Sequence, residues 1–202
     1  MTPALIAALL VAYLAGSVPT SYVVGRLGRG IDLRQHGSRS LGATNAFRVL
    51  GWQWALPVAV VDIAKGAIPV WLLSPLVGPA PLVPLAIGLA AVLGHVFSVF
   101  MGFRGGKGVA TAAGAVLALA PIPLLAALGI WTALLKLTGY VSLASMAAAL
   151  AFPMLAWWIG TSNPHVASVG AGLALFILFT HRANIGRLLA GTESRFGHRR
   201  TA

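Results

Sequence analysis

The stretch VATAAGAVLALAPIPLLAALGIWTALLK, residues 109–136, decides the fold, because it is either one long helix or two short ones. It is almost entirely apolar, and Pro121 and Pro123 stand near its middle. As a single kinked helix it would be about 42 Å long at about 1.5 Å per residue. As two helices it supplies the candidate membrane spans 109–120 and 123–137, each short for a plain crossing.

Composition places the whole chain in a membrane. Of its 202 residues, 58% are hydrophobic and 8% are charged, and the mean hydropathy is +0.90. Soluble domains carry roughly 25% charged residues. The length allows one helical bundle over residues 1–202 and no separate soluble domain. Apolar runs of about 20 residues predict the spans 3–25, 51–74, 82–102, 109–120, 123–137, 142–160 and 165–181.

The positions of Lys and Arg decide between six spans and seven. None precedes Arg26, whereas a signal peptide carries cations ahead of its apolar run. Because the charges follow the first span, the N-terminus is predicted outside. With seven spans, every loop that holds Lys or Arg lies on the cytoplasmic side, as does the tail from Arg182. Six spans would put that tail outside, against the positive-inside rule. We therefore predict an all-α integral membrane protein with seven transmembrane helices and a cytoplasmic C-terminus.

Charge and cysteine content exclude several classes of function. The net charge is +11, with only three acids, Asp32, Asp62 and Glu193, and no cysteine. The basic excess fits the positive-inside bias, anionic lipid or an anionic substrate, whereas too little soluble surface remains for nucleic acid. Thiolate nucleophiles and disulfides are excluded, and three scattered acids cannot enclose a metal ion, so we expect no metal and no cofactor. Asp62 and Lys65, three residues apart within a span, are predicted to pair.

The first cytoplasmic loop, GIDLRQHGSRSLGATNAFRVLG over residues 30–51, is polar and rich in glycine. Its 42–45 turn offers backbone N–H groups to an anion, and Arg48 follows Asn45 by about one helical turn. A plain polar loop, with a helix start capped by Thr44 or Asn45, explains the same residues.

The second loop, GFRGGKGVAT over residues 102–111, is not a Walker A phosphate loop. Met101 stands where that motif needs its first glycine, and Gly108 follows Lys107. What remains is two cations, Arg104 and Lys107, beside glycines at the start of a helix, which is an arrangement that binds anions. A turn that only orients the chain in the membrane would need the cations but no glycines.

A third polar set lies in YVSLAS, residues 140–145, and in THRANIGRLLAGTE, residues 180–193. His181 and Asn184 are three residues apart and are predicted to share a helix face. Three other histidines are interpreted as interfacial side chains: His95, His165 and His198.

Six motifs, taken in chain order, resemble one family. They are GSVPTSY (16–22), GSRSLGATNAFR (37–48), DIAKG (62–66), GHVFSVFMGFRGGKGVAT (94–111), YVSLAS (140–145) and HRANIGRLLAGTE (181–193). Together they resemble the bacterial membrane glycerol-3-phosphate acyltransferases that use acyl phosphate. The resemblance implies seven spans in the bacterial inner membrane, an active site on the cytoplasmic side and no cofactor. It also implies transfer of a fatty acyl group from acyl phosphate to glycerol 3-phosphate, which gives lysophosphatidic acid.

The resemblance also implies which residues act. The catalytic set would be Ser38, Arg48, Lys107, His181 and Asn184. The substrate-binding set would be Gly42, Ala43, Thr44, Asn45, Arg104, Gly105, Gly106, Gly108 and Ser142, with Ser142 near the glycerol phosphate. The chain departs from the family pattern at Arg39 and Ser40, where Gly-Asn is usual, and at Ser98, where proline is usual.

The motifs of other acyl-transfer enzymes are missing from the chain. No histidine is followed by aspartate five residues later, and no serine stands in Gly-x-Ser-x-Gly. The resemblance implies substrate-assisted chemistry, in which a phosphate oxygen of the donor accepts the hydroxyl proton. It implies membrane lipid as a partner and suggests the soluble enzyme that makes acyl phosphate as another. The residues alone leave two other functions open, a membrane transporter of an organic phosphate and a lipid-binding scaffold.

Overall fold

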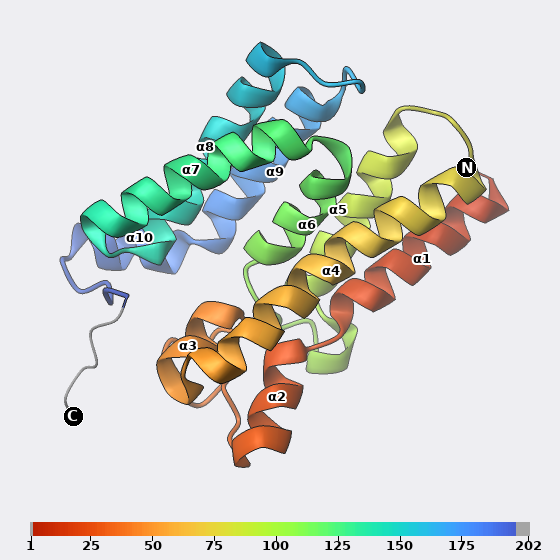
Figure 1. Cartoon of the computed structure of the whole chain (residues 1–202). Coiled ribbons are helices and arrows are strands. Elements are labelled where there is room, and N and C mark those ends of the chain that lie inside the picture. Colours follow the sequence, from red (N-terminus) through yellow and green to blue (C-terminus); the bar gives the residue numbers. More distant parts are fainter. Residues whose placement is uncertain (1, 197–202) are drawn as a thin grey trace. The chain divides into compact units, whose positions relative to one another are not determined.

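The computed structural model describes residues 2–196, and all regular structure in that range is helical. Contacts between Cα atoms divide the chain into two compact units, Met1–Leu119 and Ala120–Ala202. Figure 1 labels the α-helices of both units. The prediction of a single domain over residues 1–202 stays a prediction.

The first unit is built on close helix crossings. Its helices are α1 (Pro3–Ser17), α2 (Thr20–Arg29), α3 (Ala43–Leu50), α4 (Trp52–Val77), α5 (Leu82–Val96) and α6 (Val109–Leu119), with a 3₁₀ turn at Val99–Met101. Helix α1 packs along α5, and α4 packs along α6. A Cβ atom at Gly16 would collide with the carbonyl of Ala91, and one at Gly66 with the carbonyl of Thr111. Small residues let membrane helices approach closely, because packing rather than water exclusion holds them together.

The first span is broken, in contrast to the continuous span predicted over residues 3–25. Helices α1 and α2 together form an apolar segment, Pro3–Arg29, that is 27 residues long, and the helical pattern is interrupted at Val18 and Pro19. Proline has no N–H group and its ring blocks the carbonyl of the preceding turn, so it interrupts a helix. The expected span 3–25 is therefore two helices, and the second one continues to Arg29.

Polar side chains from distant parts of the first unit satisfy the carbonyl groups that this break exposes. The Nζ of Lys65 on α4 donates to the carbonyl of Val18 at 2.9 Å. The hydroxyl of Ser98 donates to the carbonyl of Ser17 at 2.5 Å. Lys65 also pairs with Asp62 at 2.8 Å, which confirms the predicted pair. Ser98, the departure from the family pattern, thus has a structural role in this chain.

The number of spans is only partly settled by helix length. Five segments of the described chain are long and apolar enough to cross a membrane: Pro3–Arg29, Trp52–Val77, Leu82–Met101, Pro121–Thr138 and Val141–Ile159. A sixth candidate is α9 with α10, which bend by 61°. Helix α6 has 11 residues and is about 16 Å long, against an apolar layer of about 30 Å. The predicted division of residues 109–136 is confirmed, since α6 ends at Leu119 and Pro121 begins the next helix.

The second unit contains α7 (Pro121–Thr138), α8 (Val141–Ile159), α9 (Val166–Thr180) and α10 (Arg182–Leu189). Helix α8 packs against both α7 and α9, and the three run side by side in Figure 1. The segment after α10 returns to the turn between α7 and α8. There the N–H of Phe196 donates to the carbonyl of Gly139 at 2.7 Å, and the guanidinium of Arg195 lies over the ring of Tyr140 at 5.4 Å.

Candidate functional site

The loop between α2 and α3 carries Ser38 and is held in place by Asn45. The side chain of Asn45 is 1% exposed, and its Oδ1 accepts the N–H of Ser38 at 2.8 Å. Its Nδ2 donates to the carbonyls of Leu33 and His36, both at 3.1 Å. Ser38 itself is exposed. The loop thus presents the side chain of Ser38 to solvent while the backbone of Ser38 is tied to the protein.

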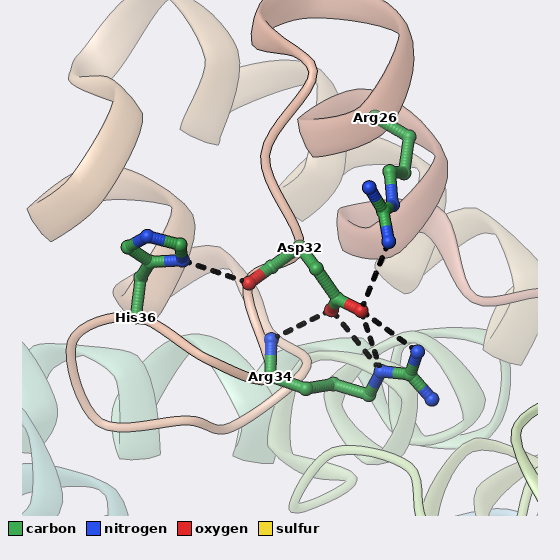
Figure 2. Close-up of polar contacts among 4 residues, drawn as sticks. All are labelled: Arg26, Asp32, Arg34 and His36. Atoms are coloured by element: carbon green, nitrogen blue, oxygen red, sulfur yellow. Dashed lines mark hydrogen bonds and ion pairs between the residues drawn. The ribbon is translucent and has the colours of Figure 1, made fainter.

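The same loop is anchored at its start by Asp32, as Figure 2 shows. The carboxylate of Asp32 is buried and accepts four hydrogen bonds from Arg34, the shortest from Nη2 at 2.7 Å, and a fifth from Arg26 at 3.4 Å. Both guanidinium groups lie against the ring of Tyr22. The side-chain hydrogen bonds from Arg34 lower the pKa of Asp32 to about 2, and the same bonds raise the pKa of Arg34.

The carbonyl of Asp32 organises the next turn. It accepts the N–H of Gln35 at 3.0 Å and bonds to Nδ1 of His36 at 2.9 Å, which requires the proton on that nitrogen (Figure 2). Residues 32–36 are therefore folded around Asp32, and the side chain of Asn45 donates hydrogen bonds to the carbonyls of Leu33 and His36 in this segment. The Asp-Leu-Arg triplet is the sequence signal for this role, and neither Asp32 nor Arg34 was among the predicted site residues.

Part of the glycine loop after α5 is packed against the protein and is not open to a ligand. The N–H groups of Gly105 and Gly106 donate to the carbonyls of Val96 and His95 at 2.9 and 3.1 Å. A Cβ atom at Gly106 would collide with the ring of His95 and with the carbonyl of Leu41. These two glycines are explained by close packing, so the expected anion binding has to rest on other groups of the loop, such as Lys107.

The structure brings the two glycine-containing loops of the first unit together. Leu41, which precedes the 42–45 turn, touches Gly106, and Met101 packs on the apolar cluster that contains Leu41. Ser38, the 42–45 turn and Arg48 belong to the first loop and its helix, and Arg104 and Lys107 belong to the second.

A small polar pocket lies behind the glycine loop, where the first span is broken. Its lining includes Asp62, Lys65 and His95, with Gly105 and Gly106 on one side. Ser17, Thr20 and Ser21 also line it, and their hydroxyls have no hydrogen-bond partner among the described residues. His95 is buried here beside Asp62, with 3.8 Å between Nδ1 and Oδ1, so the interfacial role expected for it is wrong.

In the second unit, Glu193 ties Ser142 to Asn184. One carboxylate oxygen accepts from the hydroxyl of Ser142 at 2.9 Å and from Nδ2 of Asn184 at 2.7 Å, and the other accepts from Nε of Arg187 at 2.6 Å. Burial alone would raise the pKa of Glu193, but these hydrogen bonds outweigh it and lower the pKa. Glu193 was not among the predicted site residues, although it closes the last matched motif.

His181 lies at the bend between α9 and α10 rather than on a shared helix face. Its Nδ1 is 2.8 Å from the carbonyl of Ile177, a contact that requires the proton on Nδ1. Its own carbonyl accepts the N–H of Asn184 at 2.7 Å. His181 and Asn184 are both buried and are joined through the backbone at this bend.

Comparison with known proteins places this arrangement in a family. The model of the glycerol-3-phosphate acyltransferase family matches residues 6–191. The chain belongs to the glycerol-3-phosphate acyltransferase family. A glycerol-3-phosphate acyltransferase of Chlorobaculum parvum is 44% identical, over 96% of this chain and 98% of the relative. Another, from Chlorobium phaeobacteroides (strain BS1), is 45% identical, over 95% of this chain and 96% of the relative.

Solved structures of the same family agree with the fold. A crystal structure of PlsY, an integral membrane glycerol 3-phosphate acyltransferase in its glycerol 3-phosphate form, matches with a TM-score of 0.88 at 38% identity, covering 96% of each chain. The lysophosphatidic acid form matches with a TM-score of 0.85 at 36% identity, covering 96% of this chain and 95% of the other. The family resemblance drawn from the motifs is confirmed.

Proposed function

We propose that this chain transfers a fatty acyl group from acyl phosphate to glycerol 3-phosphate. A hydroxyl oxygen of glycerol 3-phosphate attacks the acyl carbonyl carbon, and a new ester bond forms. The bond from that carbon to the phosphate oxygen breaks, and the hydroxyl proton passes to the departing phosphate. The products are lysophosphatidic acid and inorganic phosphate.

The observation that carries this proposal is the pair of solved relatives. They are a glycerol 3-phosphate form and a lysophosphatidic acid form of one integral membrane acyltransferase, and each matches almost the full length of this chain. An acceptor and its acylated product are the two ends of one reaction. The choice of acyl phosphate as donor rests on the motif resemblance.

Cations and hydroxyls from the matched motifs supply what the reaction needs. Two phosphates must approach each other, and without cations their repulsion would dominate in a partly dehydrated site. We assign this neutralisation to Arg48 and Lys107, because a guanidinium matches phosphate oxygens in a fork and an ammonium acts as a point charge. Lys107 also stabilises the oxyanion that develops on the acyl carbonyl. The exposed hydroxyl of Ser38 contacts substrate beside them.

Residues of the second unit orient the acceptor. The hydroxyl of Ser142 donates to Glu193, and a hydroxyl that donates can still accept a hydrogen bond from glycerol 3-phosphate. His181, held by the contact of its Nδ1 with the carbonyl of Ile177, is assigned to the same part of the site. A donor that is already a mixed anhydride needs mainly positioning and charge stabilisation.

The direct test is acyl transfer by the purified protein in detergent or liposomes. We expect labelled glycerol 3-phosphate and acyl phosphate to give labelled lysophosphatidic acid, and acyl-coenzyme A to be inactive as the donor. Activity should persist in EDTA, since no three metal-binding side chains gather within residues 2–196. A protein that yields no product from acyl phosphate would be a transporter or a scaffold, and the proposal would fail.

We further propose seven crossings in the bacterial inner membrane, with the N-terminus outside and the substrate-binding loops in the cytoplasm. The distribution of Lys and Arg supports this count, although α6 is short. The chain has no cysteine, so single cysteines can be labelled without background. An impermeant reagent added outside should label Ser162→Cys, but neither Gln35→Cys nor Thr192→Cys. Labelling of Thr192→Cys alone would indicate that residues 109–138 cross once.

A further inference from the structure

We propose that Asn45 is a positioning residue that acts through Ser38, and that Asp32 supports the same turn from its other end. This inference rests on the proposed acyl transfer, in which Ser38 contacts substrate. It differs from the expectation that Asn45 itself contacts substrate. The difference matters because it moves Asn45 from the set of ligand contacts to the structure that holds one of them.

The first argument is that the polar atoms of Asn45 are already used. A side-chain amide has one acceptor oxygen and two N–H donors. The oxygen accepts the N–H of Ser38, and the nitrogen donates to the carbonyls of Leu33 and His36. With 1% of its surface exposed, Asn45 can reach a phosphate only if this network breaks. Breaking it would leave buried polar groups unsatisfied, which is unfavourable.

The second argument is the conformation of the turn between Asn45 and Ser38. Gly37 has a left-handed backbone with φ of 60°, and a Cβ atom there would collide with Oδ1 of Asn45. The glycine thus lets the backbone close onto the amide. Because the N–H of Ser38 is fixed by that amide, the hydroxyl of Ser38 keeps only its own side-chain rotation. A group held in this way reacts or binds with less loss of freedom.

The third argument comes from Asp32, at the opposite end of the same segment (Figure 2). Its carboxylate is held by Arg34 and Arg26, and its carbonyl holds Gln35 and His36. The carbonyl of His36 in turn accepts a hydrogen bond from the side chain of Asn45. Asp32 and Asn45 therefore fix residues 32–36 from both sides, and Ser38 follows this segment after Gly37.

A double-mutant cycle on kcat/KM for glycerol 3-phosphate tests the inference. Asn45→Ala should lower the rate of lysophosphatidic acid formation by about 10- to 100-fold, as expected for losing buried hydrogen bonds. The same change made in Ser38→Ala should lower it by no more than about twofold, because coupled residues are not additive. Asp32→Asn is an isosteric and milder change. It should show the same pattern, with a smaller loss of rate in the protein that retains Ser38.

The matched control is Asn163→Ala. Asn163 also accepts a backbone N–H through Oδ1, that of His165 at 3.0 Å, and belongs to no substrate-binding motif. Its loss should leave the rate near parental. Thermal unfolding of all variants in detergent checks that they fold. If Asn45→Ala does not fold, Asp32→Asn still allows the test.

The outcomes separate the inference from its alternatives. Equal losses from Asn45→Ala with and without the Ser38 hydroxyl would show direct substrate contact or general destabilisation, and would overturn the inference. Loss confined to the background that retains Ser38 supports it. If the parental protein forms no lysophosphatidic acid, the proposed function fails before the cycle begins, so the two failures are distinguishable.

Discussion

Replacing Arg39 by glycine should stabilise the protein. Arg39 has a left-handed backbone with φ of 59°, at the place where the family pattern has glycine. Its side chain is exposed and forms no hydrogen bond or ion pair within residues 2–196, while its N–H donates to the carbonyl of His36 at 3.1 Å. Glycine keeps that N–H and loses nothing that the side chain supplies.

The magnitude follows from two opposing costs. A left-handed conformation costs an L-residue about 1–2 kcal/mol, and glycine does not pay it. Glycine instead loses more backbone freedom on folding, about 0.5–1 kcal/mol. The net gain is about 0.5–1 kcal/mol, which for a chain of this length raises the Tm by about 1–4 °C.

Thermal unfolding of Arg39→Gly in detergent measures this shift, with Gln35→Gly as the control. Gln35 is exposed in the same loop, and its backbone is not left-handed, so glycine there brings only the entropic cost. The control should therefore be less stable than the parental protein. Equal shifts of both variants in one direction, or no gain from Arg39→Gly, would refute the argument from backbone conformation.

Three further predictions concern the loops. Lys107→Ala should reduce acyl transfer about 10²–10³-fold, while Lys136→Ala, outside the matched motifs, stays near the parental rate. Gly106→Ala should lower the unfolding free energy by about 1–3 kcal/mol through overpacking. Gly42 has an extended backbone, and a Cβ atom there would meet no atom within 4 Å, so Gly42→Ala should unfold as the parental protein does. Any loss of activity in Gly42→Ala would then indicate that substrate occupies that space. The pKa of Asp32 is about 2 in the folded protein, against an ordinary value of 3.8. The stabilisation that its carboxylate gives is therefore complete above about pH 4 and is lost as the pH falls toward 2. Asp32→Asn should abolish this pH dependence of the unfolding free energy.

Patterns that lie within a few residues of each other were predictable from the sequence. The pairing of Asp62 with Lys65 follows from their spacing on a helix, and the division at Pro121 follows from the geometry of proline. The break at Pro19 had the same local signal. It was missed because the surrounding residues are apolar enough to read as one continuous span.

Contacts between distant residues were not predictable in the same way. Lys65 donates to Val18, 47 positions away, and Glu193 accepts from Ser142, 51 positions away. Nothing in the local spacing joins such residues, and only the packed helices bring them together. The motif resemblance named Asn45 as a site residue without showing which atoms it contacts, and the structure supplies those contacts.

The three acids explain how so basic a chain can expose cations to phosphate and still fold. Each acid lies in an ion pair with a cation outside the proposed substrate contacts: Asp32 with Arg26 and Arg34, Asp62 with Lys65, and Glu193 with Arg187. All three carboxylates are buried, and each holds a loop or a helix break together. An acid placed beside Arg48 or Lys107 would neutralise the charge that two phosphates require. The scarcity of acids and their burial in these ion pairs agree with the proposed binding of two anionic substrates.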